Sequence, residues 1–407
     1  MPGLAEPKEL LLRLLDPAHR ADPYPLYSEI RERGPIVIPE ANFAVFGTYA
    51  QCDEIFRHPA SGNDRLKSSV AQKAVAEGQP ARPFGQPGFL FLDPPDHTRL
   101  RKLAQKAFAP RVVKALEPEI VALVDQLLAN LKPDTEFDAI TGLAYPLPVA
   151  VICRLLGVPL SDEPKFSAAS GLLAQGLDPF ITFTGEVSDT FSDRLEAGQW
   201  LRGYLRDLVG QRRADPREDL ISELIAAEED GDQLTEDEIV ATCNLLLIAG
   251  HETTVNLIAN AILAMLREPR HWAALAADAG RASAIVEETL RFDPPVQLSS
   301  RVATAEMTID GITIPAGDSM MVMMASAQRD PQMYDDPDTF DPDRGAIRHL
   351  AFGLGPHFCL GAPLARLEAT IALSALTSRF PHARLTGEPV YKPNVTLRGM
   401  ASLPLTL

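Results

Sequence analysis

Apolar residues return every three or four positions over most of this chain, which is the spacing of a helix with one buried face. This spacing predicts helices over the segments 98–131, 142–157, 161–175, 190–212, 235–266, 269–278 and 281–292. A further helix is expected over 362–379, directly after a glycine-rich loop. Helix is therefore the dominant element of the predicted structure.

Strand-like alternation of apolar and polar residues is confined to shorter parts of the chain. Residues 22–60 are expected to hold a pair of strands between two short helices, and further strands are predicted between 296 and 322. Asp310-Gly311 predicts a hairpin turn within the second region. Three segments with scattered Gly, Pro, Ser or Asp are predicted as loops: 61–96, 176–189 and 328–350. The expected fold class is mainly α with a smaller β region.

Composition narrows the possible partners of the protein. The 407 residues are 46% hydrophobic, enough to bury a large core and a sizeable cofactor, and no linker or repeat divides them. We therefore expect a single domain over residues 1–407. The net charge of −17 argues against nucleic acid or an anionic membrane as the general partner. No run of eighteen apolar residues is present, so we expect no membrane anchor.

The four cysteines lie far apart and form no C-x-x-C pair. This spacing argues against a disulfide framework or a zinc cluster and favours a reducing compartment. We expect a soluble, cytoplasmic protein. Cys52, Cys153 and Cys243 are expected to be buried apolar residues of the core.

Cys359 differs from the other cysteines because of the residues around it. It stands in Phe352-Gly353-Leu354-Gly355-Pro356-His357-Phe358-Cys359-Leu360-Gly361, just before the predicted last helix. Glycines permit turns closed to other residues, and a helix N-terminus favours the thiolate form of cysteine. A thiolate on a backbone that a planar group can approach is suited to bind haem iron.

The order F-G-x-G-x-H-x-C-x-G resembles the haem-binding loop of the cytochrome P-450 monooxygenases, and every fixed position is present. The order of predicted elements is similar to that family over essentially the whole chain. The resemblance implies a helical prism enclosing haem b, with Cys359 as the iron ligand. Phe352 and Gly353 would belong to the haem-binding loop.

Ala249-Gly250-His251-Glu252-Thr253 lies within the predicted helix 235–266. Small residues at 249 and 250 would let the helix backbone pass close to a bound group, and a threonine hydroxyl can compete for a helix carbonyl. Beside the cysteine loop, the segment resembles the family's acid–alcohol motif. The resemblance implies that Thr253 steadies dioxygen and that Glu252 helps deliver the protons that break its O–O bond.

Further charged residues match family positions. The resemblance implies that haem propionates are held by four cationic residues: His97, Arg101, Arg301 and His357. Glu288 and Arg291 form an E-x-x-R pair on one helix face, and Arg344 follows in a segment similar to the family's meander. These last three residues would form a buried structural network.

The family's substrate pocket is lined by the 61–96 and 176–189 loops, the long helix and the segment after E-x-x-R. The apolar residues at these places are Phe84, Phe89, Leu90, Phe180, Ile181, Phe183, Leu246, Ala249, Val296 and Leu298. Gln297 and Thr396 are the nearby polar candidates. Together they suggest a lipophilic small molecule of the lipid, steroid, terpenoid or polyketide type.

Residues 99–114, RLRKLAQKAFAPRVVK, carry six basic residues and no acidic one, against the acidic background of the chain. The family places this helix near the cysteine, where the electron donor docks. We therefore expect an acidic, ferredoxin-type donor with a separate reductase, because no flavin or nicotinamide fingerprint is evident. Monomer is the family default.

The sequence thus predicts a haem-thiolate monooxygenase that takes one oxygen atom from O2. Two alternatives remain open at this point: a peroxide-driven haem peroxygenase, and a non-catalytic haem-thiolate binder or sensor. The Glu252-Thr253 pair argues against both, because it would have no use in either.

Overall fold

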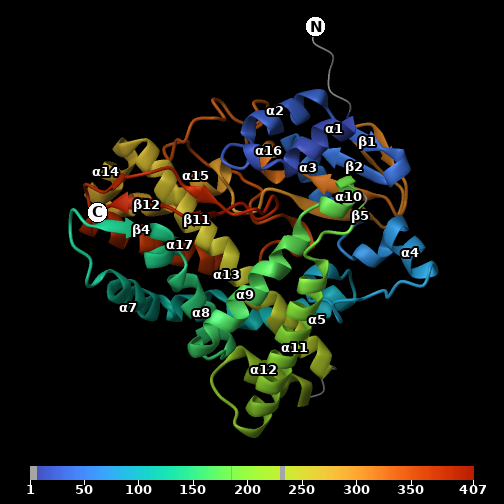
Figure 1. Ribbon diagram of the computed structural model, residues 1–407, viewed down its shortest axis with the longest axis horizontal. Coiled ribbons are helices and arrows are strands. Elements are labelled where there is room, and N and C mark those ends of the chain that lie inside the picture. Colours follow the sequence, from blue (N-terminus) through green and yellow to red (C-terminus); the bar gives the residue numbers. More distant parts are fainter. Residues whose placement is uncertain (1–6, 185, 230–233) are drawn as a thin grey trace.

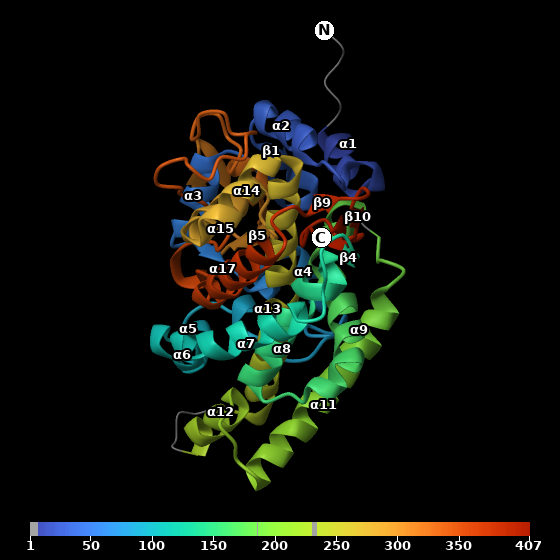
Figure 2. The same ribbon diagram turned by 90° about the vertical axis from the view of Figure 1, so that its left-hand side faces the viewer.

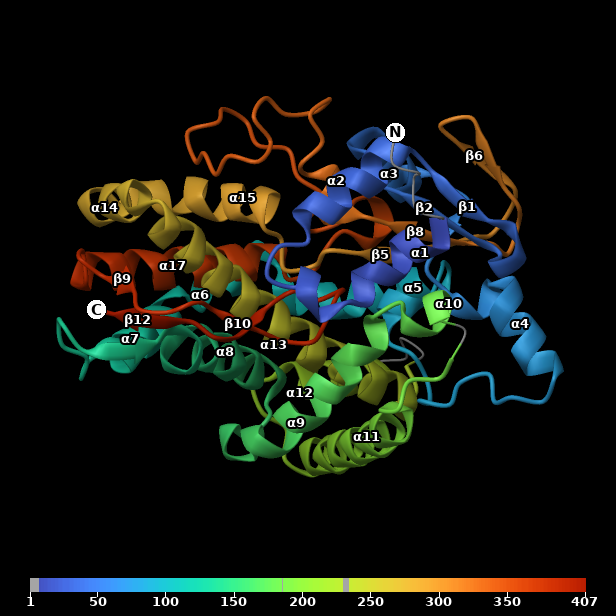
Figure 3. The ribbon, with the colours of Figure 1, turned by 45° about the horizontal axis from the view of Figure 1, so that its top comes forward.

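One long central helix organises the structure. The computed structural model describes residues 7–184, 186–229 and 234–407, and helix α13 (Glu236–Arg267) passes through the middle of them (Figures 1 and 3). Thr235 caps its start in a capping box with Glu238, which satisfies two otherwise unpaired N–H groups. By length and composition α13 could cross a membrane, but most of its side chains are buried inside the protein. Its apolar sequence is that of a core helix.

Helices from distant parts of the chain pack on α13. These are chiefly α8 (Pro146–Leu156), α9 (Glu163–Ala174), α11 (Phe191–Ala214), α14 (Pro269–Ala277), α15 (Ala282–Phe292) and α17 (Ala362–Arg379). In Figure 3, α14 and α15 lie over α17, and α7 and α8 follow beneath it. Further helices are α1 (Pro7–Leu12), α2 (Tyr24–Arg33), α3 (Tyr49–Arg57), α4 (Ser69–Ala76), α5 (Asp96–Ala104), α6 (Pro110–Ala115), α7 (Glu117–Leu128), α10 (Phe180–Thr184), α12 (Leu220–Glu229) and α16 (Met324–Ala327).

The β structure is smaller and lies mostly at one end. A five-stranded sheet has the order β1 (Ile36–Ile38), β2 (Phe43–Phe46), β8 (Ser319–Val322), β5 (Ser299–Ala303), β3 (Ser61–Gly62), and only β2 and β8 pair in parallel. Figures 1 and 2 show this sheet and α1 to α3 at the end opposite α11 and α12. The C-terminal tail contributes to two small sheets. In one, β10 (Val390–Tyr391) pairs with β11 (Met400–Ser402), and in the other, β12 (Pro404–Thr406) lies between β9 (Arg384–Leu385) and β4 (Glu136–Asp138) from earlier in the chain.

The predicted fold class is confirmed, and most of the long helices begin and end within a few residues of their predicted bounds. The predicted helical segment 98–131 is instead divided into α5, α6 and α7, with Pro110 and Pro118 in the first turns of α6 and α7. The predicted hairpin turn joins β6 (Met307–Ile309) to β7 (Ile312–Ile314), with φ of 47° at Asp310 and 76° at Gly311. The sequence interpretation missed α1, α12 and two helices inside predicted loops, α4 and α10. The last two span eight and five residues, which is too short for a helical periodicity to emerge.

Candidate functional site

The cysteine loop is held in one conformation by its glycines. Gly353 and Gly355 have φ of 63° and 68°, which side chains with a Cβ rarely adopt. A Cβ at Gly355 would also lie 2.9 Å from the Phe56 carbonyl oxygen. The Cys359 N–H donates to the Phe352 carbonyl at 2.8 Å, closing the loop just before α17. The loop therefore presents the Cys359 sulfur from a fixed backbone.

The sulfur of Cys359 lies at the N-terminus of α17. Burial raises the pKa of the Cys359 thiol, while N–H groups of Gly361 and Ala362 and the charges of Arg101 and Arg366 act in the opposite direction. The net upward shift means that the thiolate needs a stronger cation than these groups supply. A metal ion bound by Cys359 would supply it, because a ligating thiol is deprotonated outright.

Four cationic side chains gather beside this loop. The rings of His97 and His357 lie 4.0 Å apart, and Arg101 donates to the Phe358 carbonyl next to the cysteine. Arg301 is 7% exposed and donates to Ser299 Oγ at 2.8 Å. The structure thus brings together the four residues that the sequence assigned to propionates.

The carboxylate whose charge acts on this cationic cluster, Asp93, is already ion-paired with Lys67 at 2.8 Å. Burial lowers the pKa of Arg301 to about 10 and that of His357 to about 3, and the charges of His97, Arg301 and Arg101 further lower the pKa of His357. Neither ring nitrogen of His97 has a hydrogen-bond partner in the described part of the chain. A buried guanidinium without a carboxylate partner is costly, so the cluster is suited to receive carboxylates from a bound group.

Helix α13 turns one small residue toward open space. Ala249 is exposed, although most of the helix around it is buried. The Thr253 hydroxyl donates to the Ala249 carbonyl at 2.8 Å, so it competes for a backbone acceptor as expected. Gly250 was expected to let the helix backbone approach a bound group, but its lack of a side chain serves helix packing. A Cβ added at this position would lie 2.9 Å from the side chain of Ile152 on α8. Gly250 lets two helices pack closely and does not face a bound group.

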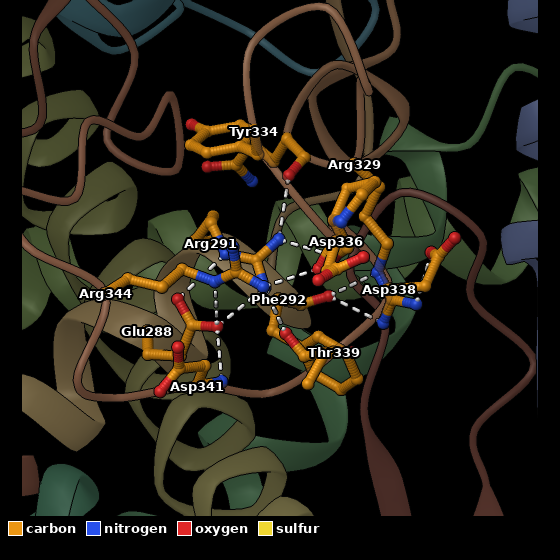
Figure 4. A network of polar contacts seen from close by, with 12 residues as sticks. Glu288, Arg291, Phe292, Arg329, Tyr334, Asp336, Asp338, Thr339, Asp341 and Arg344 are labelled. Atoms are coloured by element: carbon orange, nitrogen blue, oxygen red, sulfur yellow. Dashed lines mark hydrogen bonds and ion pairs between the residues drawn. The ribbon is translucent and has the colours of Figure 1, made fainter.

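The E-x-x-R pair and the meander arginine form one buried network (Figure 4). Arg291 donates to both carboxylate oxygens of Glu288, at 2.8 and 2.6 Å, and both side chains are 0% exposed. Arg344 Nε lies 3.3 Å from the same carboxylate. Arg291 also donates to the carbonyls of Pro337 and Thr339, which ties the irregular segment 328–350 to α15.

Comparison with known proteins identifies the family of this site. Residues 65–404 match the family model described as Cytochrome P450. This chain belongs to the cytochrome P450 family. It is 40% identical over 395 residues to the vitamin D(3) 25-hydroxylase of Pseudonocardia autotrophica, covering 95% of this chain and 94% of that protein. It is 39% identical over 413 residues to the cytochrome P450 monooxygenase PikC of Streptomyces venezuelae, covering 98% and 95%.

Solved structures agree with this assignment. CYP164A2 of Mycobacterium smegmatis in its ligand-free state has a TM-score of 0.94 and 64% identity, covering 98% of this chain and 100% of that one. P450BioI in complex with acyl carrier protein carrying hexadec-9Z-enoic acid has a TM-score of 0.85 and 33% identity, covering 96% and 100%. This P450 is therefore a haem-thiolate monooxygenase of the family that binds haem b. The cysteine, the cationic cluster and the exposed Ala249 all fit that cofactor.

The acid of the P450 acid–alcohol motif has a partner that the sequence interpretation missed. Lys392 Nζ lies 2.8 Å from Glu252 Oε2, and the two side chains are 23% and 11% exposed. Lys392 follows β10 in the C-terminal tail, far from α13 in sequence. Such a long-range contact leaves no signal in a single sequence.

The predicted pocket residues of this P450 do not belong to one cluster. Leu246 and Phe89 belong to the main core cluster, whereas Phe183 packs with Leu298 in a second cluster beneath the sheet. Phe84, Phe180 and Val296 are half-buried, and Leu90 is exposed. The side chain of Ile181 lies outside the described part of the structure.

The two polar pocket candidates are largely engaged with backbone. Thr396 donates its hydroxyl to the Leu177 carbonyl at 3.0 Å, and Gln297 donates its amide to the Pro294 carbonyl at 2.6 Å. Asp178 accepts from the Thr396 N–H at 2.7 Å, which fastens the 176–189 segment to the tail. Among the described residues, the amide oxygen of Gln297 has no partner and is left to accept a hydrogen bond.

The basic segment of this P450 lies beside the cysteine loop. Arg101 of α5 reaches the Phe358 carbonyl, and the Phe358 ring is 40% exposed. Arg99 is used elsewhere, in an ion pair with Glu238. Four exposed cations remain, for which no ion pair is found within the described residues: Lys102, Lys106, Arg111 and Lys114. They define the basic face of α5 and α6.

Proposed function

We propose that this P450 inserts one atom of O2 into a lipophilic small molecule of the lipid, steroid, terpenoid or polyketide type. The observation that carries the proposal is the exposure of Ala249, close to the Glu252-Thr253 pair in the middle of a helix that is mostly buried. The candidate lining residues are apolar, which suits a substrate with few charges. Relatives support the class, since their names or complexes include vitamin D3, testosterone and myristic acid.

In this proposal, Cys359 is the axial ligand and His97, Arg101, Arg301 and His357 hold the two propionates. When bound, the haem supplies the reductive activation of dioxygen. Hydrogen bonds from Gly361 and Ala362 to the Cys359 sulfur moderate its electron donation. The Cys359→Ser variant should lose the thiolate signature of the reduced carbon monoxide spectrum.

Phe352 and Gly353 position this ligand. Gly353 provides the turn, and the Phe352 carbonyl accepts the Cys359 N–H. Glu288, Arg291 and Arg344 act at a distance by fixing the meander that leads into the loop. We assign these three residues a structural role.

Glu252 and Thr253 manage protons in the proposed reaction. Thr253 offers a hydroxyl at the open side of α13, where it can hydrogen-bond dioxygen in place of the Ala249 carbonyl. Glu252 is ion-paired with Lys392 and must leave that pair to pass a proton toward Thr253. A complete acid–alcohol pair supports the use of O2 rather than peroxide.

We propose that an acidic ferredoxin, reduced by its own reductase, supplies the electrons. Arg101, next to Lys102 on α5, reaches the cysteine loop, so a donor bound at the basic face would have a short path to the haem. Its exposed cations stand out against a net charge of −17 and can steer an acidic partner. We further propose that the protein acts in the cytoplasm as a single-domain monomer.

A ligand screen on the ferric protein tests the substrate class. Vitamin D3, testosterone, myristic acid and a macrolide form the panel, and displacement of water from iron is followed as a Soret shift. A saturable shift with one class is expected, and the Ala249→Leu variant should weaken it by filling the open space. Ala115→Leu, at an exposed position of α6, is the matched control. No shift with any compound, despite a normal carbon monoxide spectrum, would contradict the lipophilic pocket.

A further inference from the structure

His251, between the packing glycine and the acid of α13, is fully buried. Its side chain is 1% exposed, and neither ring nitrogen has a hydrogen-bond partner among the described residues. A buried imidazole without partners is unfavourable, and a leucine would fill the same place without that cost. The sequence interpretation gave this residue no role, because it occupies a variable position of the motif. The burial of this imidazole among polar groups suggests that it has a function.

Polar groups from three other segments surround this imidazole. The ring of Tyr145, at the start of α8, stands against His251 with centroids 5.2 Å apart and planes at 78°. The Tyr145 hydroxyl donates to Glu163 and contacts Ser167, both on α9. Glu252 and its partner Lys392 complete the surroundings, because their charges also act on His251.

This cluster leads from the protein surface toward the proposed proton donor. Glu163, Ser167 and Tyr145 are partly exposed, whereas His251 and Glu252 are buried. Burial lowers the pKa of His251, so the imidazole is neutral near pH 7 despite the opposing effect of the Glu252 and Glu163 carboxylates. A neutral imidazole carries one N–H donor and one acceptor nitrogen. It can therefore take a proton at one nitrogen and release one from the other.

We propose that His251 passes protons from the Tyr145–Glu163 pair to Glu252. Once solvent has protonated the Glu163 carboxylate, that proton moves to the Tyr145 oxygen as the Tyr145 proton moves, through a bridging water molecule, to the acceptor nitrogen of His251. The other ring nitrogen releases its proton, through a second water molecule, to the Glu252 carboxylate, so that Tyr145 and His251 carry no net charge afterwards. Solvent reprotonates Glu163. This inference rests on the proposed role of Glu252 and adds the route by which that acid is refilled.

Proton exchange at the ring of His251 tests the route without turnover. The haem-loaded, diamagnetic ferrous carbon monoxide form, labelled with ¹⁵N in histidine, reports the exchange of each ring N–H with water. Exchange at His251 should be fast despite its burial, and Tyr145→Phe should slow it by about tenfold. His271 is also buried, stacks edge-on with Phe340 and serves as the internal control. Slow exchange at both histidines, or no effect of Tyr145→Phe, would overturn the route.

Turnover of the panel compound that gives the largest Soret shift distinguishes failure of the His251 relay from failure of the proposed role of Glu252. His251→Phe should reduce product formed per electron by about tenfold, and the double variant with Tyr145→Phe should be no worse, because both lie on one path. The solvent isotope effect on product formation should rise in the single and in the double variant.

Two further variants complete the experiment. His251→Gln replaces His251→Phe if the Phe variant fails to bind haem, and His271→Phe is the control that should leave the product yield unchanged. If Glu252→Gln lowers the yield but His251→Phe does not, the relay alone is wrong. If Glu252→Gln changes nothing, the role of Glu252 is wrong.

Discussion

The ammonium nitrogen of Lys392 lies 2.8 Å from the carboxylate of Glu252 and joins the C-terminal tail to the middle of helix α13. Both side chains are mostly buried, so neither charge is well solvated alone. The contact therefore keeps Glu252 as a carboxylate paired with Lys392. Although Glu252 is next to Thr253 in the sequence, its carboxylate binds the lysine of the tail.

Lys392→Met should lower the free energy of unfolding by about 1–3 kcal/mol, because it leaves the Glu252 carboxylate buried without its cation. Chemical denaturation of the haem-loaded protein measures the change. Lys392→Met combined with Glu252→Gln should recover part of the loss. A double-mutant cycle with no coupling between the two substitutions would contradict the pairing.

Glu368 should make stability depend on pH. It lies on α17, is 2% exposed, and its Oε2 has no partner in the described part of the chain. Burial raises its pKa from 4.5 to about 8. Between these values the unfolded chain has released a proton that the folded chain retains, so stability falls as pH rises from 4.5 to 8, by on the order of 4 kcal/mol.

Glu368→Gln should remove that slope and stabilise the protein at pH 8. Urea denaturation at several pH values from 4.5 to 8 checks both effects. The exposed Glu77, changed to Gln, is the matched control and should leave the slope as it is. An unchanged slope in Glu368→Gln would show that Glu368 ionises normally in the folded protein.

Thr253→Ala should leave the spectra nearly normal and divert electrons to peroxide. Without the hydroxyl, residue 253 can no longer exchange its hydrogen bond to the Ala249 carbonyl for one to dioxygen. Peroxide and product are measured per electron consumed, with a panel compound as substrate. Thr254→Ala, one residue along and buried, is the control and should stay coupled. Tight coupling in Thr253→Ala would argue against its role.

Reversing the charge of Lys102, Lys106 and Lys114 to Glu should slow reduction of the iron by at least about tenfold and flatten its salt dependence. Stopped-flow reduction by a ferredoxin at several ionic strengths measures both. The same reversal at Lys73, Lys132 and Lys165, exposed residues outside the basic face, should change much less. Equal rates in the two triple variants would rule out docking at this face.

Local signals predicted the elements of this P450 well. The periodicity of α13 and α17 and the Asp310-Gly311 turn are properties of contiguous residues, so one sequence contains them. Helices α4 and α10 depend on caps and tertiary contacts more than on periodicity, and they were missed. The prediction that His97, Arg101, Arg301 and His357 belong to one site came from the resemblance to the family and not from their spacing in the sequence.

Long-range polar contacts could not be predicted from the sequence. The pairing of Glu252 with Lys392 and the packing of His251 against Tyr145 join positions more than a hundred residues apart. Gly250 shows a second limit, since it was expected to let the helix backbone approach a bound group, whereas in the structure its missing side chain makes room for Ile152. Helix faces are fixed by the surrounding fold, and one sequence does not show which residue meets which neighbour.

The origin of the inserted oxygen tests the central claim most directly. The haem-loaded protein is supplied with a ferredoxin, its reductase and the panel compound of largest Soret shift under ¹⁸O2, and the product is analysed by mass spectrometry. A monooxygenase incorporates one ¹⁸O atom per oxidised product, and the label vanishes under ¹⁶O2 in ¹⁸O-water. Oxidised product that carries label only when ¹⁸O-labelled peroxide is added would show a peroxygenase. No oxidised product with any compound that shifts the Soret band would contradict the proposed activity.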